Sequence, residues 1–279
     1  MNYRHAFHAG NFADVFKHLV LVALLEALKR KEKGFAYFET HAGAGRYDLR
    51  DPAVQKTAEY RDGIGRLWRA ASADPLTTAY LAAVRGVNRG PALRVYPGSP
   101  RIARALVRPQ DRLGLAEREP GECARLAREF ARDRQVRVEC GDGYARLDAW
   151  LPPPEARGLV LLDPPYESAG EWRTVGEAVV AAHRRWSTGV YALWYPLKAG
   201  APVARLKQAL EASGVRRILV AELEVWPNDT PFRLNGCGMA MINPPWRVDE
   251  ELERALPPLS GQLRQGPRAT ARVEWLVPE

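Results

Sequence analysis

GLVLLDPPY, residues 158–166, is the stretch that decides the fold of this chain. Its four successive apolar residues, 159–162, are typical of a short strand buried on both faces of a parallel sheet. Proline cannot donate to a sheet hydrogen-bond ladder, so the strand must end before Pro164. In open α/β sheets, ligands bind beyond the carboxyl ends of the strands. The sequence therefore predicts that Asp163 and Tyr166 lie at a functional edge of the sheet.

Asp163-Pro164-Pro165-Tyr166 resembles the Asp/Asn-Pro-Pro-aromatic motif of S-adenosyl-L-methionine (SAM)-dependent methyltransferases that modify exocyclic amino nitrogens, chiefly N6 of adenine. The lone pair of this amino group is delocalised into the ring and is a poor nucleophile. The Asp163 carboxylate and a carbonyl of the proline pair could accept both N–H groups, while Tyr166 stacks on an extruded base. Alternatively, Asp163 caps the next helix and Tyr166 packs in the core.

The composition is that of a basic globular protein. Its 41 Lys and Arg residues exceed its 33 Asp and Glu residues, which gives a formal charge of +8 and a pI near 9.6. This balance favours a polyanionic partner. The longest apolar run, residues 19–28, is interrupted by Glu26 and is too short to span a bilayer. With no signal-peptide pattern at its start, the chain is expected to be cytoplasmic, without a membrane partner.

Three cysteines, Cys123, Cys140 and Cys237, are odd in number and show no metal-ligand spacing. We interpret them as free thiols in a reducing compartment. No metal site is predicted, and the protein is expected to be a monomer.

A first strand, 35–39, precedes the glycine-rich turn His41-Ala42-Gly43-Ala44-Gly45. Such a turn lets a cofactor approach the backbone closely. It lacks the full dinucleotide spacing and resembles the first SAM-binding motif of class I methyltransferases. The next strand is expected only at 112–116, farther away than a simple crossover requires.

Two helical patterns, 53–70 and 76–87, fill the intervening segment. We therefore predict a helical insertion at residues 47–96, carried by a Rossmann-like domain of residues 1–46 and 97–279. Ser99, followed by a proline, fits the N-cap of the helix that resumes there, and cofactor binding is the alternative role.

Two further carboxylates follow strands. Glu117 ends the strand 112–116, where an acidic residue in nucleoside-binding folds accepts hydrogen bonds from ribose hydroxyls. Asp142-Gly143 follows the strand 136–139 and resembles the position that contacts the cofactor adenine, unless it is only a tight turn. The remaining expected elements are helices at 14–31, 120–132, 172–186, 203–213 and 249–263, and strands at 189–194, 217–225, 238–242 and 271–277.

The amino-terminal segment concentrates base-stacking and phosphate-binding groups: Tyr3, His5 and His8 lie within a few residues. Lys17 and His18 follow in the first turns of the helix 14–31. A frayed terminus and ordinary first-turn residues are the alternatives.

The motif occurs twice, because Asn243-Pro244-Pro245-Trp246 also satisfies it. Chain order separates the copies. Residues 159–162 form the fourth expected strand, beside the glycine-loop strand, whereas 239–242 form about the seventh, expected at or near an edge. We assign the chemistry to Asp163 and treat Asn243 as structural.

A composite of motifs extending from end to end resembles the RlmJ family of bacterial 23S ribosomal RNA adenine-N6-methyltransferases. The matching stretches are 3–5 (YRH), 7–11 (FHAGN), Asp14 with 17–18 (KH), 41–47 (HAGAGRY), 96–100 (YPGSP), 163–166 (DPPY), 191–196 (YALWYP) and 275–279 (WLVPE).

This resemblance implies a class I SAM-dependent methyltransferase with a mostly parallel, seven-stranded type of sheet and a small helical insertion. The implied reaction forms N6-methyladenosine at one adenine of 23S rRNA, with SAM and no metal. Asp163, within the motif that includes Pro164, Pro165 and Tyr166, would act on the amino group. The implied cofactor residues are His18, His41, Ser99, Glu117, Asp142, Gly143 and Asp163, and the implied substrate residues are Tyr3, His5 and Lys17.

Three other interpretations compete with this one. A DNA adenine methyltransferase would share the pocket. A protein-glutamine methyltransferase can use a related Asn-Pro-Pro-Tyr motif, although Asp163 in place of Asn and the basic balance argue against it. An RNA-binding protein without turnover could keep the same charge pattern.

Overall fold

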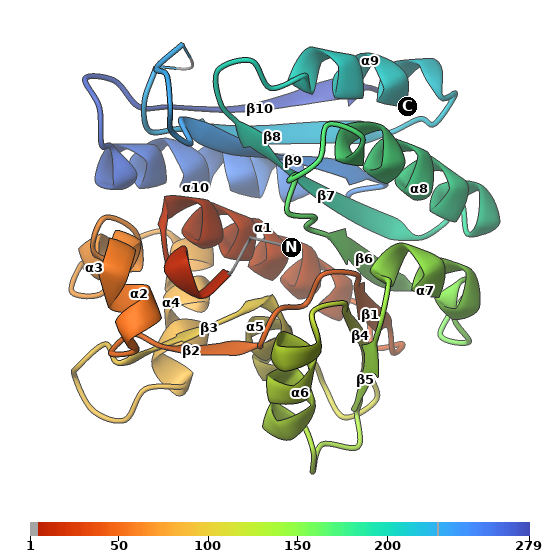
Figure 1. The fold of residues 1–279 in the computed structure, drawn as a ribbon. Coiled ribbons are helices and arrows are strands. Elements are labelled where there is room, and N and C mark those ends of the chain that lie inside the picture. Colours follow the sequence, from red (N-terminus) through yellow and green to blue (C-terminus); the bar gives the residue numbers. More distant parts are fainter. Residues whose placement is uncertain (1–4, 228) are drawn as a thin grey trace.

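A computed structural model describes residues 5–227 and 229–279. Its main sheet has eight strands in the order β10-β8-β9-β7-β6-β1-β4-β5 (Figure 1). The strands β5, β4, β1, β6 and β7 are parallel, β9 is antiparallel to both of its neighbours, and β10 is antiparallel to β8. The predicted Rossmann-like, mostly parallel fold is confirmed. The strands are β1 (Ala36–Glu39), β4 (Arg112–Glu117), β5 (Val136–Cys140), β6 (Gly158–Leu162), β7 (Val190–Leu197), β8 (Ile218–Glu224), β9 (Gly236–Ile242) and β10 (Thr270–Val277).

Helices cover both faces of this sheet (Figure 1). All five residues of β6 are buried, as expected for a strand covered on both sides. On one face lie α1 (Phe12–Lys29), α5 (Ser99–Leu106), α6 (Pro120–Glu129) and α10 (Val248–Leu263), and on the other lie α7 (Gly143–Trp150), α8 (Glu171–Arg185) and α9 (Val203–Ala212).

Helix α1 is the most buried of these helices, because it lies between the sheet and the helices α4, α5 and α10. Its buried positions run around the whole helix and include the polar residues Asp14, Lys17 and His18. Charged side chains at such positions are rarely tolerated without partners. Their environment is therefore central to the site.

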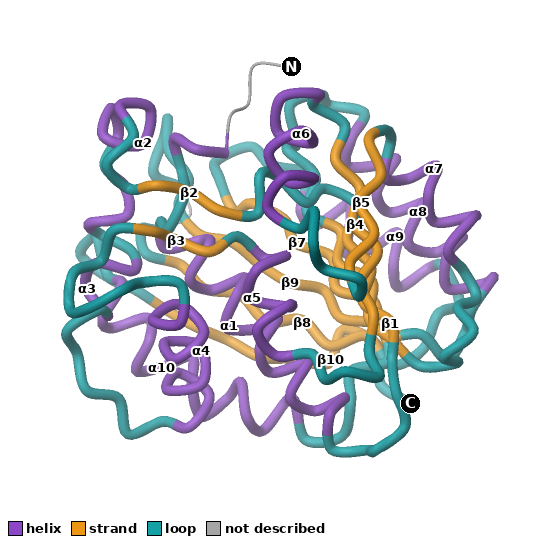
Figure 2. Tube along the Cα trace, turned by 90° about the horizontal axis from the view of Figure 1, so that it is seen from below, coloured by secondary structure: helices purple, strands orange, loops and turns teal. Residues whose placement is uncertain are grey.

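Residues 46–97, within the connection from β1 to β4, form the insertion, but it is not purely helical. A two-stranded antiparallel sheet of β2 (Arg46–Asp48) and β3 (Val95–Pro97) closes it, beside the main sheet in Figure 2. Its helices are α2 (Pro52–Thr57), η2 (Glu59–Arg61), α3 (Ile64–Leu67) and α4 (Pro75–Gly86).

The expected continuous helix at 53–70 was wrong. Ala58 adopts a left-handed conformation (φ 51°) and ends α2. Gly63 then packs so closely on the amino-terminal segment that a Cβ there would lie 2.1 Å from the carbonyl oxygen of Gly10. The tertiary contact, rather than helical propensity, sets this path.

Three other local expectations need correction. The strand β9 does not lie at the edge of the sheet but between β7 and β8, and β10 forms that edge. For Asp142-Gly143, the alternative of a tight turn is wrong, because Asp142 caps α7 and Gly143 begins it. The N-cap of α5 is Gly98, so Ser99 is the first helical residue and its hydroxyl is available for another bond.

The prediction of three free thiols was also wrong. Cys123 of α6 and Cys140 of β5 form a disulfide, with their Cα atoms 5.7 Å apart. The α6 crossover between β4 and β5 brings the two residues together, and their sequence spacing gave no signal of this. Cys237 is free and buried, and burial raises the pKa of its thiol.

Among the described helices, none is long and apolar enough to cross a membrane. Over the same residues, no group of three or more His, Cys, Asp or Glu side chains is placed to hold a metal ion.

Candidate active site

A large cavity of about 1350 Å³ opens at the carboxyl ends of the parallel strands. Single small-ligand pockets occupy roughly 300–1,000 Å³, so this cavity has room for two ligands. Of the predicted residues, it is lined by His5, Lys17, His41, Ser99, Glu117, Asp142, Gly143, Asp163, Pro164, Pro165 and Tyr166. The structure thus brings together groups from distant parts of the sequence.

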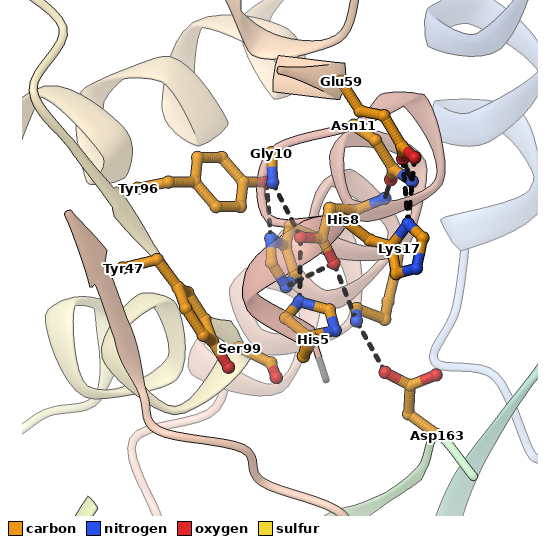
Figure 3. Close-up of polar contacts among 12 residues, drawn as sticks. His5, His8, Gly10, Asn11, Lys17, Tyr47, Glu59, Tyr96, Ser99 and Asp163 are labelled. Carbon is orange, nitrogen blue, oxygen red and sulfur yellow. Dashed lines mark hydrogen bonds and ion pairs between the residues drawn. The ribbon is translucent and has the colours of Figure 1, made fainter. Parts of the chain in front are cut away.

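At the centre of the cavity, Asp163 pairs with Lys17 of α1. The Lys17 Nζ lies 2.6 Å from Asp163 Oδ2 (Figure 3) and 2.9 Å from Asp14 Oδ1. Both Lys17 and Asp14 are buried, with side chains 5% and 2% exposed. The ammonium group therefore connects the motif carboxylate to a second, buried carboxylate in the first turn of α1.

Asp14 organises the start of the chain around this pair. Its Oδ2 accepts a hydrogen bond from the Gly10 backbone N–H (2.9 Å) and lies 3.0 Å from His5 Nε2. Although burial opposes ionisation, the charges of His5 and Lys17 hold the pKa of Asp14 well below its usual value. Asp14 is therefore a buried anion that gathers His5 and Lys17 on one side of the cavity.

Contacts with the insertion also fix the amino-terminal segment. His8 Nδ1 lies 3.0 Å from Glu59 Oε2, and Asn11 Nδ2 donates to the same carboxylate at 3.0 Å (Figure 3). Burial lowers the pKa of His8, but the hydrogen bond and charge of Glu59 outweigh it and raise the pKa. The insertion thus forms one wall of the cavity.

On the opposite side, the glycine-rich turn contacts the predicted ribose-binding carboxylate. Glu117 Oε2 accepts from the Gly43 backbone N–H at 2.7 Å, and Oε1 accepts from the Glu119 backbone N–H at 2.7 Å. Burial raises the pKa of Glu117. His41 Nδ1 lies 2.8 Å from the Thr40 hydroxyl, and burial lowers its pKa to about 4, which keeps the imidazole neutral near pH 7.

Asp142 and Gly143 lie at the start of α7. Asp142 caps this helix, because its Oδ1 accepts from the Tyr144 backbone N–H at 2.9 Å. Gly143 packs against the turn after β1, where a Cβ would lie 1.9 Å from the Thr40 carbonyl oxygen. The close approach of Gly143 to Thr40 brings the start of α7 against the turn after β1, and both Asp142 and Gly143 line the cavity.

Sequence reasoning missed Glu39, the last residue of β1. It is fully buried, and its carboxylate accepts a hydrogen bond from Tyr37 Oη (2.7 Å) and another from Ser99 Oγ. Burial raises the pKa of Glu39 to about 8. A carboxylate ending an apolar strand just before a glycine-rich turn was the available signal. Ser99 therefore connects α5 to the end of β1 rather than capping its own helix.

His18 does not line the cavity, contrary to expectation. His18 is fully buried and does not line it; its Nδ1 lies 2.8 Å from Tyr96 Oη, and burial lowers its pKa to about 3. In this structure His18 contacts Tyr96 instead of lining the cavity, and its predicted role in cofactor binding stays a prediction. Tyr3 lies outside the described residues, so its predicted role in substrate binding stays a prediction.

Tyr166 is packed to a large extent. Its hydroxyl donates to the Trp194 carbonyl oxygen at 2.7 Å, and its ring centroid lies 4.3 Å from that of Trp172. The residue is 6% exposed but still contributes to the cavity wall. Most of the Tyr166 ring therefore packs against neighbouring side chains.

The second copy of the motif lies at the opposite end of the strands, beside the amino ends of the parallel strands. Because β9 runs antiparallel to β7, the carboxyl end of β9 points away from Asp163. Asn243 Nδ2 donates to the carbonyl oxygens of Ser187 and Gly189, at 2.8 and 2.9 Å. These bonds tie the turn before β7 to the end of β9, as expected for a structural residue.

A mostly parallel sheet of this strand order, with a glycine-rich turn after β1 and DPPY after β6, defines a Rossmann-like class I methyltransferase domain. Residues 32–277 match the family described as "RsmJ: Ribosomal RNA large subunit methyltransferase D, RlmJ". The chain belongs to this family.

Similar proteins agree with this assignment. The chain is 44% identical to "Ribosomal RNA large subunit methyltransferase J" of Escherichia coli (strain K12) and 43% identical to the protein of that name from Haemophilus influenzae, over the full length of each. A crystal structure of protein LPL1258 from Legionella pneumophila has a TM-score of 0.87 at 35% identity, covering 96% of this chain and 98% of that one.

Proposed function

We propose that this protein transfers a methyl group from SAM to N6 of one adenine in 23S rRNA. The observation that carries the proposal is the position of Asp163 at the end of β6, in the middle of a cavity large enough for two ligands. Membership of a family of ribosomal RNA methyltransferases supports the substrate class. We expect the protein to act as a monomer.

The side of the cavity formed by β1, β4 and β5 fits SAM. Glu117 lies where ribose hydroxyls need acceptors, and the turn around Gly43 lets a ligand approach the backbone. His41, Ser99, Asp142 and Gly143 complete this side. When bound, SAM supplies an electrophilic methyl group on a sulfonium.

Asp163 would accept a hydrogen bond from one N–H of the target amino group. This bond would orient the nitrogen lone pair toward the methyl group. Lys17 holds the carboxylate in place through the 2.6 Å contact, so an incoming adenine must share or displace this contact. His5 and Lys17 would contact the substrate beside the motif. The adenine must leave its stack to reach the cavity, as for other base-modifying enzymes.

The test is mass-spectrometric mapping of methylated adenosines in 23S rRNA incubated with SAM and the protein. The wild-type protein should produce N6-methyladenosine at one position. Asp163→Ala should lower the methylation rate at saturating SAM by about 100-fold or more.

DNA of the same sequence serves as the competing substrate. Methylation of DNA in preference to RNA would favour the DNA-methyltransferase alternative. Tight RNA binding without SAM binding would instead indicate a protein without turnover.

A further inference from the structure

The loop between β8 and β9 lines the same cavity as Asp163, although no motif marked it. Trp226, Phe232, Arg233 and Leu234 of this loop all contribute to the lining. The loop lies at the upper left of Figure 1. Its hydrogen bond from the Asn235 backbone N–H to the Leu197 carbonyl oxygen (2.8 Å) places it beside the end of β7.

The strand order puts this loop on the side of Asp163 away from the cofactor residues. Because β8 is parallel to β7, its carboxyl end lies at the same edge of the sheet as that of β6. Three strand spacings, roughly 14 Å, separate β8 from β6. The glycine-rich turn, Glu117 and Asp142 follow β1, β4 and β5, on the other side of β6.

Charge divides the cavity in the same way. The side formed after β4 and β5 carries Glu117, Glu119, Glu122 and Asp142, with Arg118 as its cation. The side formed after β7 and β8 carries Lys198 and Arg233. A polyanion that enters the cavity is therefore favoured over β7 and β8.

Two aromatic residues accompany these cations. Phe232 has a fully exposed side chain and a left-handed backbone (φ 60°), an unusual conformation for a bulky residue. An isolated exposed aromatic residue is common, but this one lies at a cavity that opens toward a catalytic carboxylate. Strained residues of this kind are concentrated at ligand-binding sites.

The second aromatic residue is fixed in place. Trp226 Nε1 donates to Gln265 Oε1 at 3.4 Å, and Gly266 packs so closely that a Cβ would lie 2.5 Å from the indole ring. The Arg233 guanidinium lies over the same ring, with its Cζ 4.2 Å from the centroid. This stack presents a planar cation whose N–H groups suit a phosphate.

We propose that this loop forms a subsite for a nucleotide that flanks the target adenosine in the RNA strand. Phe232 stacks on its base, and Arg233, supported by Trp226, contacts a phosphate together with Lys198. Exposed aromatic faces beside cations are the usual means of holding single-stranded RNA. This inference rests on the proposed function and extends it to the neighbouring nucleotide.

The test compares Phe232→Ala and Arg233→Gln with the wild-type protein. Trp246→Ala is the matched control, because Trp246 is also exposed (77%) but follows β9 at the opposite edge of the sheet. Binding of a 23S rRNA transcript is measured by fluorescence anisotropy over a range of salt concentrations. SAM binding is measured by calorimetry, and methylation is measured in single turnovers.

Phe232→Ala should weaken RNA binding about tenfold without changing its salt dependence, since stacking carries no charge. Arg233→Gln should lower the slope of log Kd against log salt by about one unit. Both variants should keep the SAM affinity and the rate at saturating RNA, and Trp246→Ala should match the wild type in every measurement.

RNA affinity and salt slope that stay at wild-type values in both loop variants would overturn the subsite while leaving the proposed function intact. A loss of SAM affinity in either variant would also overturn it, because the loop would then support the cofactor side. If the wild-type protein neither binds nor methylates the transcript, the proposed function itself fails.

Discussion

At the scale of single residues, the most consequential group in the site is Asp14, a buried carboxylate outside the DPPY motif. It contacts Lys17, His5 and the Gly10 backbone N–H at once, and Lys17 in turn contacts Asp163. Removing one charge from a buried network leaves its partners uncompensated, which costs more than the contacts themselves. Asp14 should therefore govern both stability and the orientation of Lys17.

We predict that Asp14→Asn lowers the free energy of unfolding by about 3 kcal/mol, as measured in urea. Methylation should fall about tenfold or more, because Lys17 then has a different balance of charges beside Asp163. The folded-state pKa of Asp14 is lowered, so its contribution to stability is present above the ordinary Asp pKa and is lost as the pH falls through the lowered value.

Asp62→Asn is a suitable stability control, since this carboxylate is 59% exposed and pairs with Arg66 on the surface. It should change the free energy of unfolding by less than about 1 kcal/mol. Equal stability of the Asp14 and Asp62 variants would contradict an organising role for Asp14.

Glu39 provides a pH-dependence prediction of the opposite sign. Its pKa is about 8 in the folded protein, above its ordinary value of 4.5, so the folded state binds the proton more tightly. Stability from this group is fully present below pH 4.5 and is lost as the pH rises through 8. Glu39→Gln, which cannot ionise, should remove this loss.

Between pH 5 and pH 8, the wild-type free energy of unfolding should fall by on the order of 2–4 kcal/mol relative to Glu39→Gln. Chemical denaturation at several pH values measures this difference. Parallel pH profiles for the two proteins would show that Glu39 ionises normally in the folded state.

At the scale of elements, strand direction decides which copy of the motif lies at the cavity. Both copies follow buried strands, but β6 is parallel to β1 and β9 is antiparallel to β7. Asp163 therefore faces the cavity, whereas the Asn243 side chain bonds to two backbone carbonyl groups at the far edge. The expectation that Asn243 is structural agrees with this geometry, although it was argued from an edge position that β9 does not occupy.

We predict that Asn243→Ala lowers the free energy of unfolding by about 1–3 kcal/mol, because the carbonyl groups of Ser187 and Gly189 lose their donor and alanine is disfavoured in the left-handed conformation that Asn243 adopts (φ 53°). SAM affinity and the methylation rate at saturating substrate should remain at wild-type values. These are measured at a temperature where the variant is folded. A selective loss of methylation would place chemistry at the second copy.

At the scale of the whole molecule, the cavity forms where three separate parts meet. The amino-terminal segment, the insertion and the edge of the sheet each contribute walls, and His8 with Glu59 joins the first two. The sheet order then arranges the lining with acidic residues over β4 and β5, Asp163 at the centre, and Lys198 and Arg233 over β7 and β8. A net charge of +8 attracts polyanions to the whole molecule, whereas this local arrangement favours their binding over β7 and β8.

The sequence by itself determined the sheet class, most strand and helix positions, and the cavity residues from His41 to Asp163. These features depend on short apolar runs, proline and glycine breaks, and the carboxyl-end rule, all of which are local or depend only on chain order. The resemblance to the family motifs pointed to the same cavity residues.

Only the tertiary structure decided the rest, because it depends on contacts between residues far apart in the chain. The helix expected at 53–70 breaks where Gly63 meets Gly10, and Cys123 reaches Cys140 across a crossover. The same long-range packing buries His18 behind the cavity wall and brings the loop carrying Phe232 to its rim. Sequence periodicity indicates which face of each element is buried and which is exposed to solvent. It does not indicate which distant element covers the buried face.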